Sequence, residues 1–244
     1  MSRQVSIWNS VEGLPGSKAS GQRQAQLLEV LVFLFLIVPS MVLSFFVLRQ
    51  GSVSFELTAV AAILRDLALV SLIAFFLWRN GEPISLVGWK PRGAGREILV
   101  GVALFLPLMA VTNIVEQLFR AAGLSAPSRP LPQFLTASGL SEYALASLLV
   151  LVVAIAEETV FRGYLILRFR EVTHSTAAAV LLAAFVFSLG HGYEGAAGVA
   201  TVGVIGLLFA GVYLWRGSLV APVVMHFLLD FISIVVLPIL GNRR

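Results

Sequence analysis

Two adjacent carboxylates stand inside an apolar stretch of the sequence. Glu157 and Glu158 follow SLLVLVVAIA without interruption, and Arg162 comes one helical turn after Glu158. On a helix the i,i+4 spacing places Glu158 and Arg162 on one face, close enough to pair, and leaves Glu157 without a local cation. A carboxylate beside a like charge in a low-dielectric setting takes up a proton readily, which suits a general base or acid. The alternative is a buried ion-pair network that fixes helix packing, although such a network needs only one of the two glutamates.

Two of the three histidines also lie in apolar segments. His191 ends VLLAAFVFSLGH, where a histidine between glycines could equally be a helix cap. His226 lies one turn into the last apolar segment, with Asp230 at i+4. This spacing lets the Asp230 carboxylate orient the imidazole, or lets both side chains bind one metal ion. Counted from the intervening turns at the rise of a helix, Glu157, His191 and His226 reach similar depths, so the sequence predicts that they meet.

Three more charged residues fall inside apolar segments. Arg65 and Asp66 are neighbours, and neighbours on a helix point about 100° apart, so we expect each to pack against polar groups of other helices. Glu116 has Arg120 at i+4, which predicts a structural ion pair near a membrane boundary.

The segments that must position these groups are long and apolar. The chain has 244 residues, of which 58% are hydrophobic and 12% charged, and this composition excludes a soluble globular enzyme. A polar, flexible tail at residues 1–24 precedes seven apolar segments, at residues 27–48, 57–78, 98–119, 141–170, 176–191, 196–215 and 219–240. Since about 20 apolar residues span a bilayer, we expect one domain over residues 25–244, an all-α, polytopic transmembrane bundle of about 7 to 8 helices. The segment 141–170 exceeds the hydrocarbon core and must tilt, bend or protrude.

The basic residues indicate topology and not a nucleic-acid partner. The net charge is +4, but Lys and Arg occur singly or in short groups between apolar segments. More of them fall on the side of the N-terminus than on the other, which predicts a cytoplasmic N-terminus in a bacterial-type plasma membrane. The absence of cysteine excludes disulfides, iron–sulfur clusters, thiolate zinc sites and a cysteine nucleophile. The oligomeric state is not predicted.

Three short motifs, in this order, resemble the CPBP family of intramembrane proteases. They are EExxxR from Glu157 to Arg162, FxxxH from Phe187 to His191, and HxxxD from His226 to Asp230. That family includes CAAX prenyl endopeptidases of the Ras-converting type and bacteriocin-processing or abortive-infection proteins. The resemblance covers about residues 96–240, the motif-bearing core. It departs from the prenyl endopeptidase branch at Asp230, where that branch usually has Asn.

The resemblance implies an intramembrane endopeptidase, a hydrolase that acts on a peptide or protein substrate, with a prenylated one among the options. Glu157 would activate a water for attack on a peptide carbonyl, with His191 assisting. The pair of Glu158 and Arg162 would orient Glu157.

The resemblance also implies that His226 and Asp230 complete the site, by stabilising the oxyanion or by holding a metal. Glu157, His191 and His226 could bind zinc with one open position. The same residues could run a metal-free, glutamate-activated water mechanism, and the sequence leaves both open. Two other functions remain as alternatives: a non-catalytic scaffold that binds a membrane or cell-wall protein, and a proton-coupled transporter, for which we find no paired broken helices.

Overall fold

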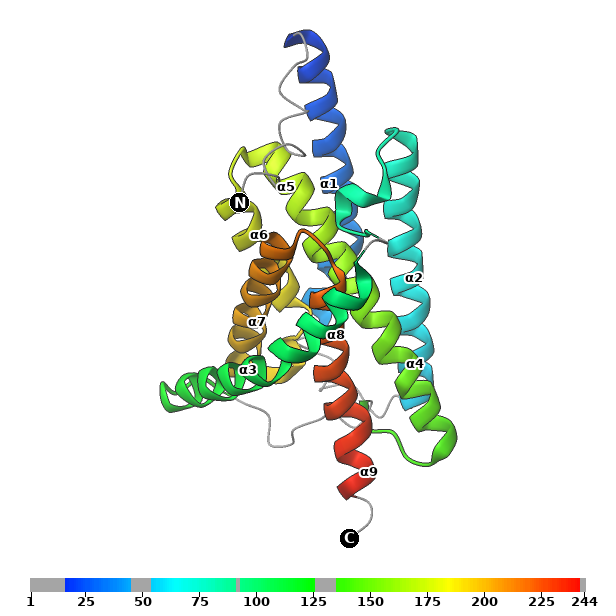
Figure 1. Ribbon diagram of the computed structural model, residues 1–244, viewed down its shortest axis with the longest axis vertical. Helices are drawn as coiled ribbons and strands as arrows, with labels where there is room; N and C mark the ends of the chain where they lie inside the picture. Colours follow the sequence, from blue (N-terminus) through cyan, green and yellow to red (C-terminus); the bar gives the residue numbers. More distant parts are fainter. Residues whose placement is uncertain (1–15, 45–53, 91–92, 126–134, 242–244) are drawn as a thin grey trace.

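The computed structural model describes residues 16–44, 54–90, 93–125 and 135–241, and within these ranges all regular structure is helical (Figure 1). The longer helices are α1 (Gly16–Ser44), α2 (Phe55–Arg79), α3 (Ala94–Ala121), α4 (Leu140–Glu157), α6 (Thr176–Leu189), α7 (Gly195–Arg216) and α8 (Val220–Asp230). Shorter elements join or extend them: η4 (Ile84–Val87), η6 (Glu158–Leu165), α5 (Ile166–Thr173), η7 (Gly192–Glu194), η8 (Phe231–Val236) and α9 (Leu237–Gly241). The prediction of an all-α fold is confirmed.

Most of the predicted segments correspond to helices that could cross a membrane. Five described helical stretches are long and apolar enough to do so, and two shorter apolar helices cover residues 24–39 and 176–189. The number of membrane crossings therefore stays a prediction. Helix α1 begins at Gly16, so the end of the segment predicted as a flexible tail is helical, and residues 1–15 lie outside the described ranges.

One long helical rod runs through the molecule and contains the EExxxR motif. Helix α4, the π-helix η6 and helix α5 form a continuous stretch from Leu140 to Thr173, 34 residues long. Figure 1 shows this rod tilted across the other helices, as its predicted excess length requires. All eight residues of η6 are buried, and π-helical turns, which are rare, occur frequently at functional sites.

Close contacts between small residues and backbone hold the core around this rod. A Cβ added at Gly163 in η6 would lie 2.7 Å from the carbonyl oxygen of Val87, and one at Gly206 in α7 would lie 3.2 Å from Ala184 Cβ. Trp89 Nε1 donates a hydrogen bond to Thr159 Oγ1 at 3.0 Å, so this tryptophan is attached to η6. The loop after η4 is thereby packed against the π-helix.

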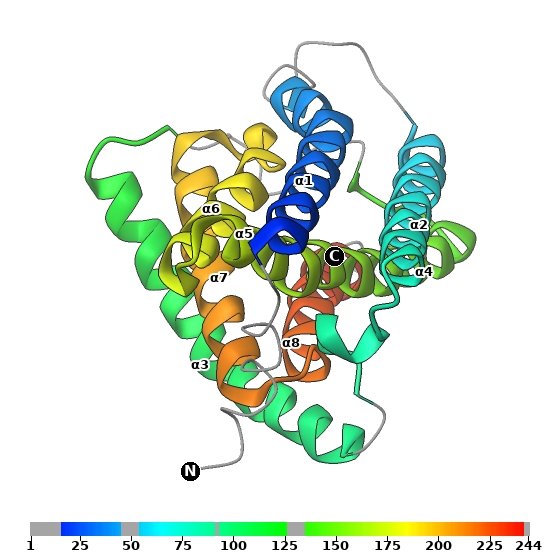
Figure 2. The same ribbon diagram turned by 90° about the horizontal axis from the view of Figure 1, so that it is seen from above.

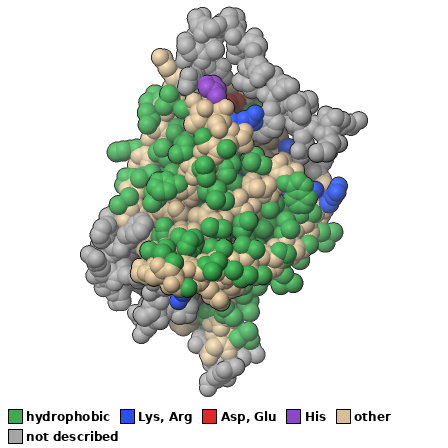
Figure 3. Space-filling view, turned by 90° about the vertical axis from the view of Figure 1, so that its left-hand side faces the viewer, with side chains coloured by type: hydrophobic (Ala, Val, Ile, Leu, Met, Phe, Trp, Pro, Cys, Tyr) green, Lys and Arg blue, Asp and Glu red, His purple; other side chains and the backbone are tan. Residues whose placement is uncertain are grey.

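The outer surface of the bundle is apolar. Large exposed hydrophobic side chains lie along the helices, for example Phe35 in α1 and Leu99 and Leu106 in α3. Figure 3 shows one broad face on which hydrophobic side chains dominate and charged ones are few. Such a surface is stable in a lipid environment, and together with the five apolar helices it defines an integral membrane protein.

Candidate active site

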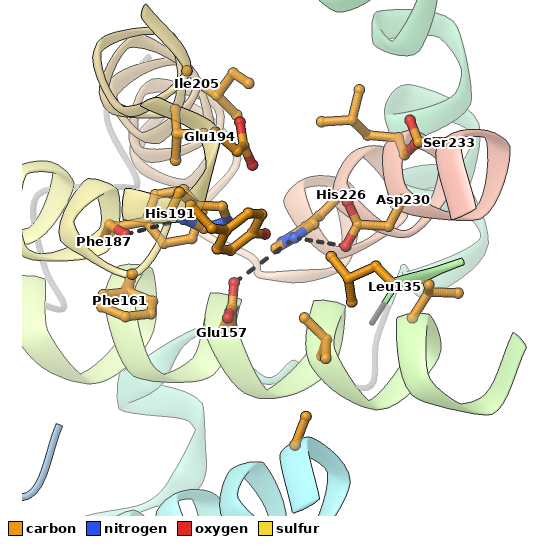
Figure 4. Close-up of a pocket in the computed structure, with 18 of the residues that line it drawn as sticks. Leu135, Glu157, Phe161, Phe187, His191, Glu194, Ile205, His226, Asp230 and Ser233 are labelled. Carbon is orange, nitrogen blue, oxygen red and sulfur yellow. Dashed lines mark hydrogen bonds and ion pairs between the residues drawn. The ribbon is translucent and has the colours of Figure 1, made fainter. Parts of the chain in front are cut away.

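A cavity of about 720 Å³ opens between the helices and contains the predicted site. Glu157, His191, His226 and Asp230 all border it, and they come from α4, the turn after α6, and α8. Figure 4 shows Glu157 pointing into the cavity from α4, toward His191 and His226. The side chains that the depth argument expected to meet therefore border the same cavity.

His226 lies at the centre of the site and contacts three carboxylates. Its Nδ1 lies 2.8 Å from Glu158 Oε1, and its Nε2 lies 3.3 Å from Asp230 Oδ2 and 3.9 Å from Glu157 Oε2. The last two contacts are drawn as dashed lines in Figure 4. The predicted contact between His226 and Asp230 across one helical turn is confirmed. Both ring nitrogens face carboxylate oxygens. When the ring is protonated to the imidazolium, each nitrogen can therefore donate a hydrogen bond to a carboxylate.

Glu158 and Arg162 form a buried ion pair behind the cavity. Arg162 Nη1 lies 2.9 Å from Glu158 Oε1, and the two side chains are 2% and 0% exposed, which confirms the predicted i,i+4 pair. The Arg162 guanidinium also lies over the rings of Phe187, at 4.1 Å, and Phe209, at 5.1 Å. Cation–π contacts of this kind stabilise a desolvated guanidinium. Glu158 Oε1 therefore accepts from both Arg162 and His226, and links the ion pair to the cavity.

His191 takes a different position from His226. Its Nδ1 lies 3.3 Å from the carbonyl oxygen of Phe187, one turn earlier, and its ring centroid is 5.1 Å from the Phe187 ring. This is the helix-end contact expected of a capping histidine. His191 nevertheless borders the cavity as well. If Nδ1 donates to the carbonyl, Nε2 is the acceptor of the neutral ring.

Arg65 and Asp66 make a contact that the sequence did not predict. Arg65 Nε donates to Asp66 Oδ1 at 2.9 Å, so these neighbours pair with each other. The long arginine side chain can bend back along α2, and the buried carboxylate, 3% exposed, provides a charged acceptor where water is scarce. In contrast, the expected pair of Glu116 and Arg120 is confirmed, with a hydrogen bond of 3.0 Å.

Sequence reasoning missed other side chains of the cavity. Tyr193 and Glu194, in η7, border it shortly after His191, and Arg65, which the sequence assigned to helix packing, borders it from α2. Tyr193 and Glu194 lie between two apolar segments, whereas the sequence analysis sought charges inside such segments. Their nearness to the histidine in the sequence was the available signal.

A bound metal does not fit the arrangement of the side chains. Among the described residues, no three His, Asp or Glu side chains are placed to hold a metal ion. A histidine ligand needs a lone pair on the nitrogen that faces the metal, and both nitrogens of His226 face carboxylates. His191 keeps a lone pair at Nε2 when its Nδ1 donates to the carbonyl of Phe187. The zinc site predicted at Glu157, His191 and His226 is therefore not assembled within the part of the chain that the structure describes.

The fold and the site together define a class of protein: a helical integral membrane protein with a cavity whose carboxylates and histidines can transfer protons to and from a bound molecule. Residues 139–232 match the family model described as type II CAAX prenyl endopeptidase, Rce1-like. The matched segment contains all six predicted site residues, and it confirms the resemblance to the CPBP family. It covers less than half of the chain and does not include α1, α2 or α3. Neither the curated proteins nor the solved structures compared with the chain gave a match.

Proposed function

We propose that this protein is an intramembrane endopeptidase that hydrolyses a peptide bond with a water activated by Glu157. The observation that supports this most directly is the position of Glu157, whose carboxylate enters the cavity and lies 3.9 Å from His226 Nε2. Of the two adjacent glutamates, it is the one whose oxygens are accessible from the cavity, because Glu158 is 0% exposed and paired with Arg162.

The reaction begins when the Glu157 carboxylate takes a proton from a water in the cavity. The hydroxide oxygen forms a bond to the peptide carbonyl carbon, and the electron pair of the C=O double bond moves to the carbonyl oxygen. The tetrahedral intermediate then collapses as the C–N bond breaks, and Glu157 returns its proton to the leaving amine. Glu157 thus acts first as base and then as acid.

The other predicted residues hold Glu157 and its charge in place. His226 lies between Glu157, Asp230 and Glu158, and Arg162 fixes Glu158 from behind. This chain of charged contacts orients the imidazole and offsets the negative charge around Glu157. His191 is placed to accept a proton at Nε2 from a substrate group in the cavity.

We propose a peptide substrate, and the family match suggests a prenylated one. Apolar side chains of α1 and α2 also border the cavity, among them Leu36, Ile37 and Leu69. An apolar group on the substrate would be stabilised there, because its burial removes apolar surface from water. A panel of quenched fluorescent peptides, each with and without a farnesyl group on a cysteine, identifies the preferred substrate.

The test of the proposed function is the variant Glu157→Gln in the same panel. Purified wild-type protein in lipid nanodiscs should cleave at least one peptide, and Glu157→Gln should lower kcat by about 1000-fold or more, since the amide cannot accept the proton from water. Glu142→Gln is the control, because Glu142 caps the main chain of Ser138 at the start of α4 and should leave kcat unchanged. Full activity of Glu157→Gln would contradict the proposal. Rescue of a deletion strain by the inactive variant would favour the scaffold.

We also propose that the N-terminus is cytoplasmic. The side that the basic residues predict as cytoplasmic includes Arg168 and Arg216, whose ion pairs with Glu82 and Glu97 tie their segments together. Because the sequence has no cysteine, single cysteines introduced at Ser20 and Ser138 can be labelled selectively. A membrane-impermeant maleimide added to intact cells should label Ser138→Cys and not Ser20→Cys, and the reverse pattern would overturn the topology.

A further inference from the structure

Arg65 is a charged side chain near the middle of α2, a helix long and apolar enough to span a membrane. It borders the same cavity as Glu157, and its side chain is 51% exposed. A guanidinium at membrane depth is costly, so such residues usually face a cavity and act there. Arg65 lies outside the segment that matches the family model.

Asp66 holds the Arg65 guanidinium by one edge only. Arg65 Nε and Nη2 both contact Asp66 Oδ1, at 2.9 and 2.8 Å. A guanidinium has five N–H donors in one plane, so this pairing leaves the Nη1 group for another acceptor. Because Asp66 is buried, it fixes the direction of the arginine at the cavity wall.

Arg65 also interacts with the proposed base. Besides Asp66, Arg65 interacts electrostatically with Glu157 and Tyr193, both of which border the cavity. Helix α2 packs along α4, which provides Glu157, and Figure 2 shows these two helices side by side. Arg65 therefore places positive charge beside the carboxylate that would activate the water.

Several other donors around the cavity already have acceptors, and Arg120, which also borders it, pairs with Glu116. Both nitrogens of His226 face carboxylates, and the hydroxyl of Tyr193 hydrogen-bonds Glu194. The Ser233 hydroxyl donates to the carbonyl of Leu229. Thr112 and Asn113 both donate to the carbonyl of Met109. Glu157, Asp230 and Glu194 supply acceptors, which cannot stabilise a developing negative charge when ionised.

We propose that Arg65 is a catalytic residue that donates hydrogen bonds to the oxyanion of the tetrahedral intermediate. This inference rests on the proposed hydrolysis. When hydroxide adds to the peptide carbon, the carbonyl oxygen gains the electron pair of the double bond and becomes an anion. That anion forms beside Glu157 and Asp230, and the Nη1 group of Arg65 offsets its charge. A preorganised donor of this kind acts mainly in the transition state, so it affects kcat more than KM.

The test compares Arg65→Gln with Arg216→Gln on the peptide that wild-type protein cleaves best. Arg216 is a suitable control, because it is an arginine paired with a carboxylate, Glu97, and it does not border the cavity. Arg65→Gln should lower kcat by about 100- to 1000-fold with KM changed less than about threefold, whereas Arg216→Gln keeps the wild-type kcat. Arg65→Ala should regain part of its kcat in millimolar guanidinium, and Arg216→Ala should show no such response.

A double variant separates charge stabilisation from structural support. Asp230→Asn places an amide N–H donor in the cavity. The fold-decrease in kcat caused by Arg65→Gln should therefore be at least ten times smaller in this background than in the wild type. Equal losses in both backgrounds, or a wild-type kcat in Arg65→Gln, would overturn the role of Arg65. If Glu157→Gln is inactive while Arg65→Gln is fully active, only this inference fails; if wild-type protein cleaves no peptide, the proposed function fails as well.

Discussion

Two arginines of the same helical rod lie in contrasting surroundings. Arg162, in η6, is buried with a single carboxylate partner, Glu158, and is otherwise covered by aromatic rings. Arg168, in α5, is 0% exposed and contacts three carboxylates: Glu29 at 3.6 Å, Glu171 at 3.0 Å, and Glu82. We refer to the first group, with His226 and its partners, as the site cluster, and to the second group as the clamp cluster.

The clamp cluster joins three helices and is closed on itself. Glu29 of α1 accepts hydrogen bonds from Asn80 at 2.9 Å and from Tyr164 at 3.1 Å, and it also pairs with Arg79. Each of its carboxylates contacts an arginine, and these contacts fasten α1 and the end of α2 to α5. The site cluster instead leaves Glu157 with an oxygen in a cavity. Buried carboxylates that face a cavity are available for chemistry, whereas those enclosed by ion pairs fix the fold.

The largest expected effect is that of Arg162→Gln, which should remove both activity and stability. Glu158 would keep its charge without a cation, and its hydrogen bond to His226 would no longer be oriented. We expect kcat to fall by about 1000-fold and the free energy of unfolding to fall by about 3 to 5 kcal/mol. The measurements are cleavage of the panel peptide in nanodiscs and unfolding by SDS titration. Wild-type turnover in this variant would show that the site cluster is only structural.

Arg168→Gln should affect stability alone. Removing the cation of the clamp cluster leaves Glu29, Glu82 and Glu171 facing one another, and we expect the free energy of unfolding to fall by about 3 to 5 kcal/mol. The kcat of the folded fraction, counted by gel filtration, should stay within about twofold of the wild type, since no clamp residue borders the cavity.

Arg120→Gln is the matched control for that loss. Its ion pair with Glu116 is largely exposed, so its removal should cost less than about 1 kcal/mol. If Arg168→Gln unfolds like this control, the two clusters do not differ as proposed.

The smallest expected effect is that of a chelator. Because both nitrogens of His226 face carboxylates, we expect wild-type kcat to stay unchanged after treatment with 1,10-phenanthroline. Metal content measured on the same sample should be below about one ion per ten molecules. Loss of activity that added zinc restores would show instead that the site cluster rearranges around a metal.

The sequence predicted the parts of the molecule that depend on local spacing. Hydrophobic length located the helices, and i,i+4 spacing identified the contacts of Glu158 with Arg162, His226 with Asp230, and Glu116 with Arg120. The rise per residue was enough to place Glu157 near His226 in depth. These inferences succeed because helix geometry is regular and a membrane limits how the helices can lie.

The remaining features depend on contacts between distant parts of the chain. The contact of His226 with Glu158 joins two helices, and no pattern in a single sequence determines which carboxylate an imidazole will face. The same holds for Trp89 and Thr159. The pairing of Arg65 with Asp66 was missed because helix geometry fixes where Cβ points and not how a long flexible side chain bends.

The π-helix has a consequence for how the two clusters are oriented. In an α-helix each residue advances by about 100°, whereas π-helical turns take in an extra residue and so change the phase of everything that follows. Helix α5 therefore presents Arg168 to α1 and α2 at an angle that a uniform α-helix would not give. Deleting one residue between Thr159 and Phe161 would restore an α-helical count and rotate the clamp by roughly a quarter turn against the site. The number of residues in η6 thus sets the angle between the clamp cluster, which binds α1 and α2, and the site cluster, which faces the cavity.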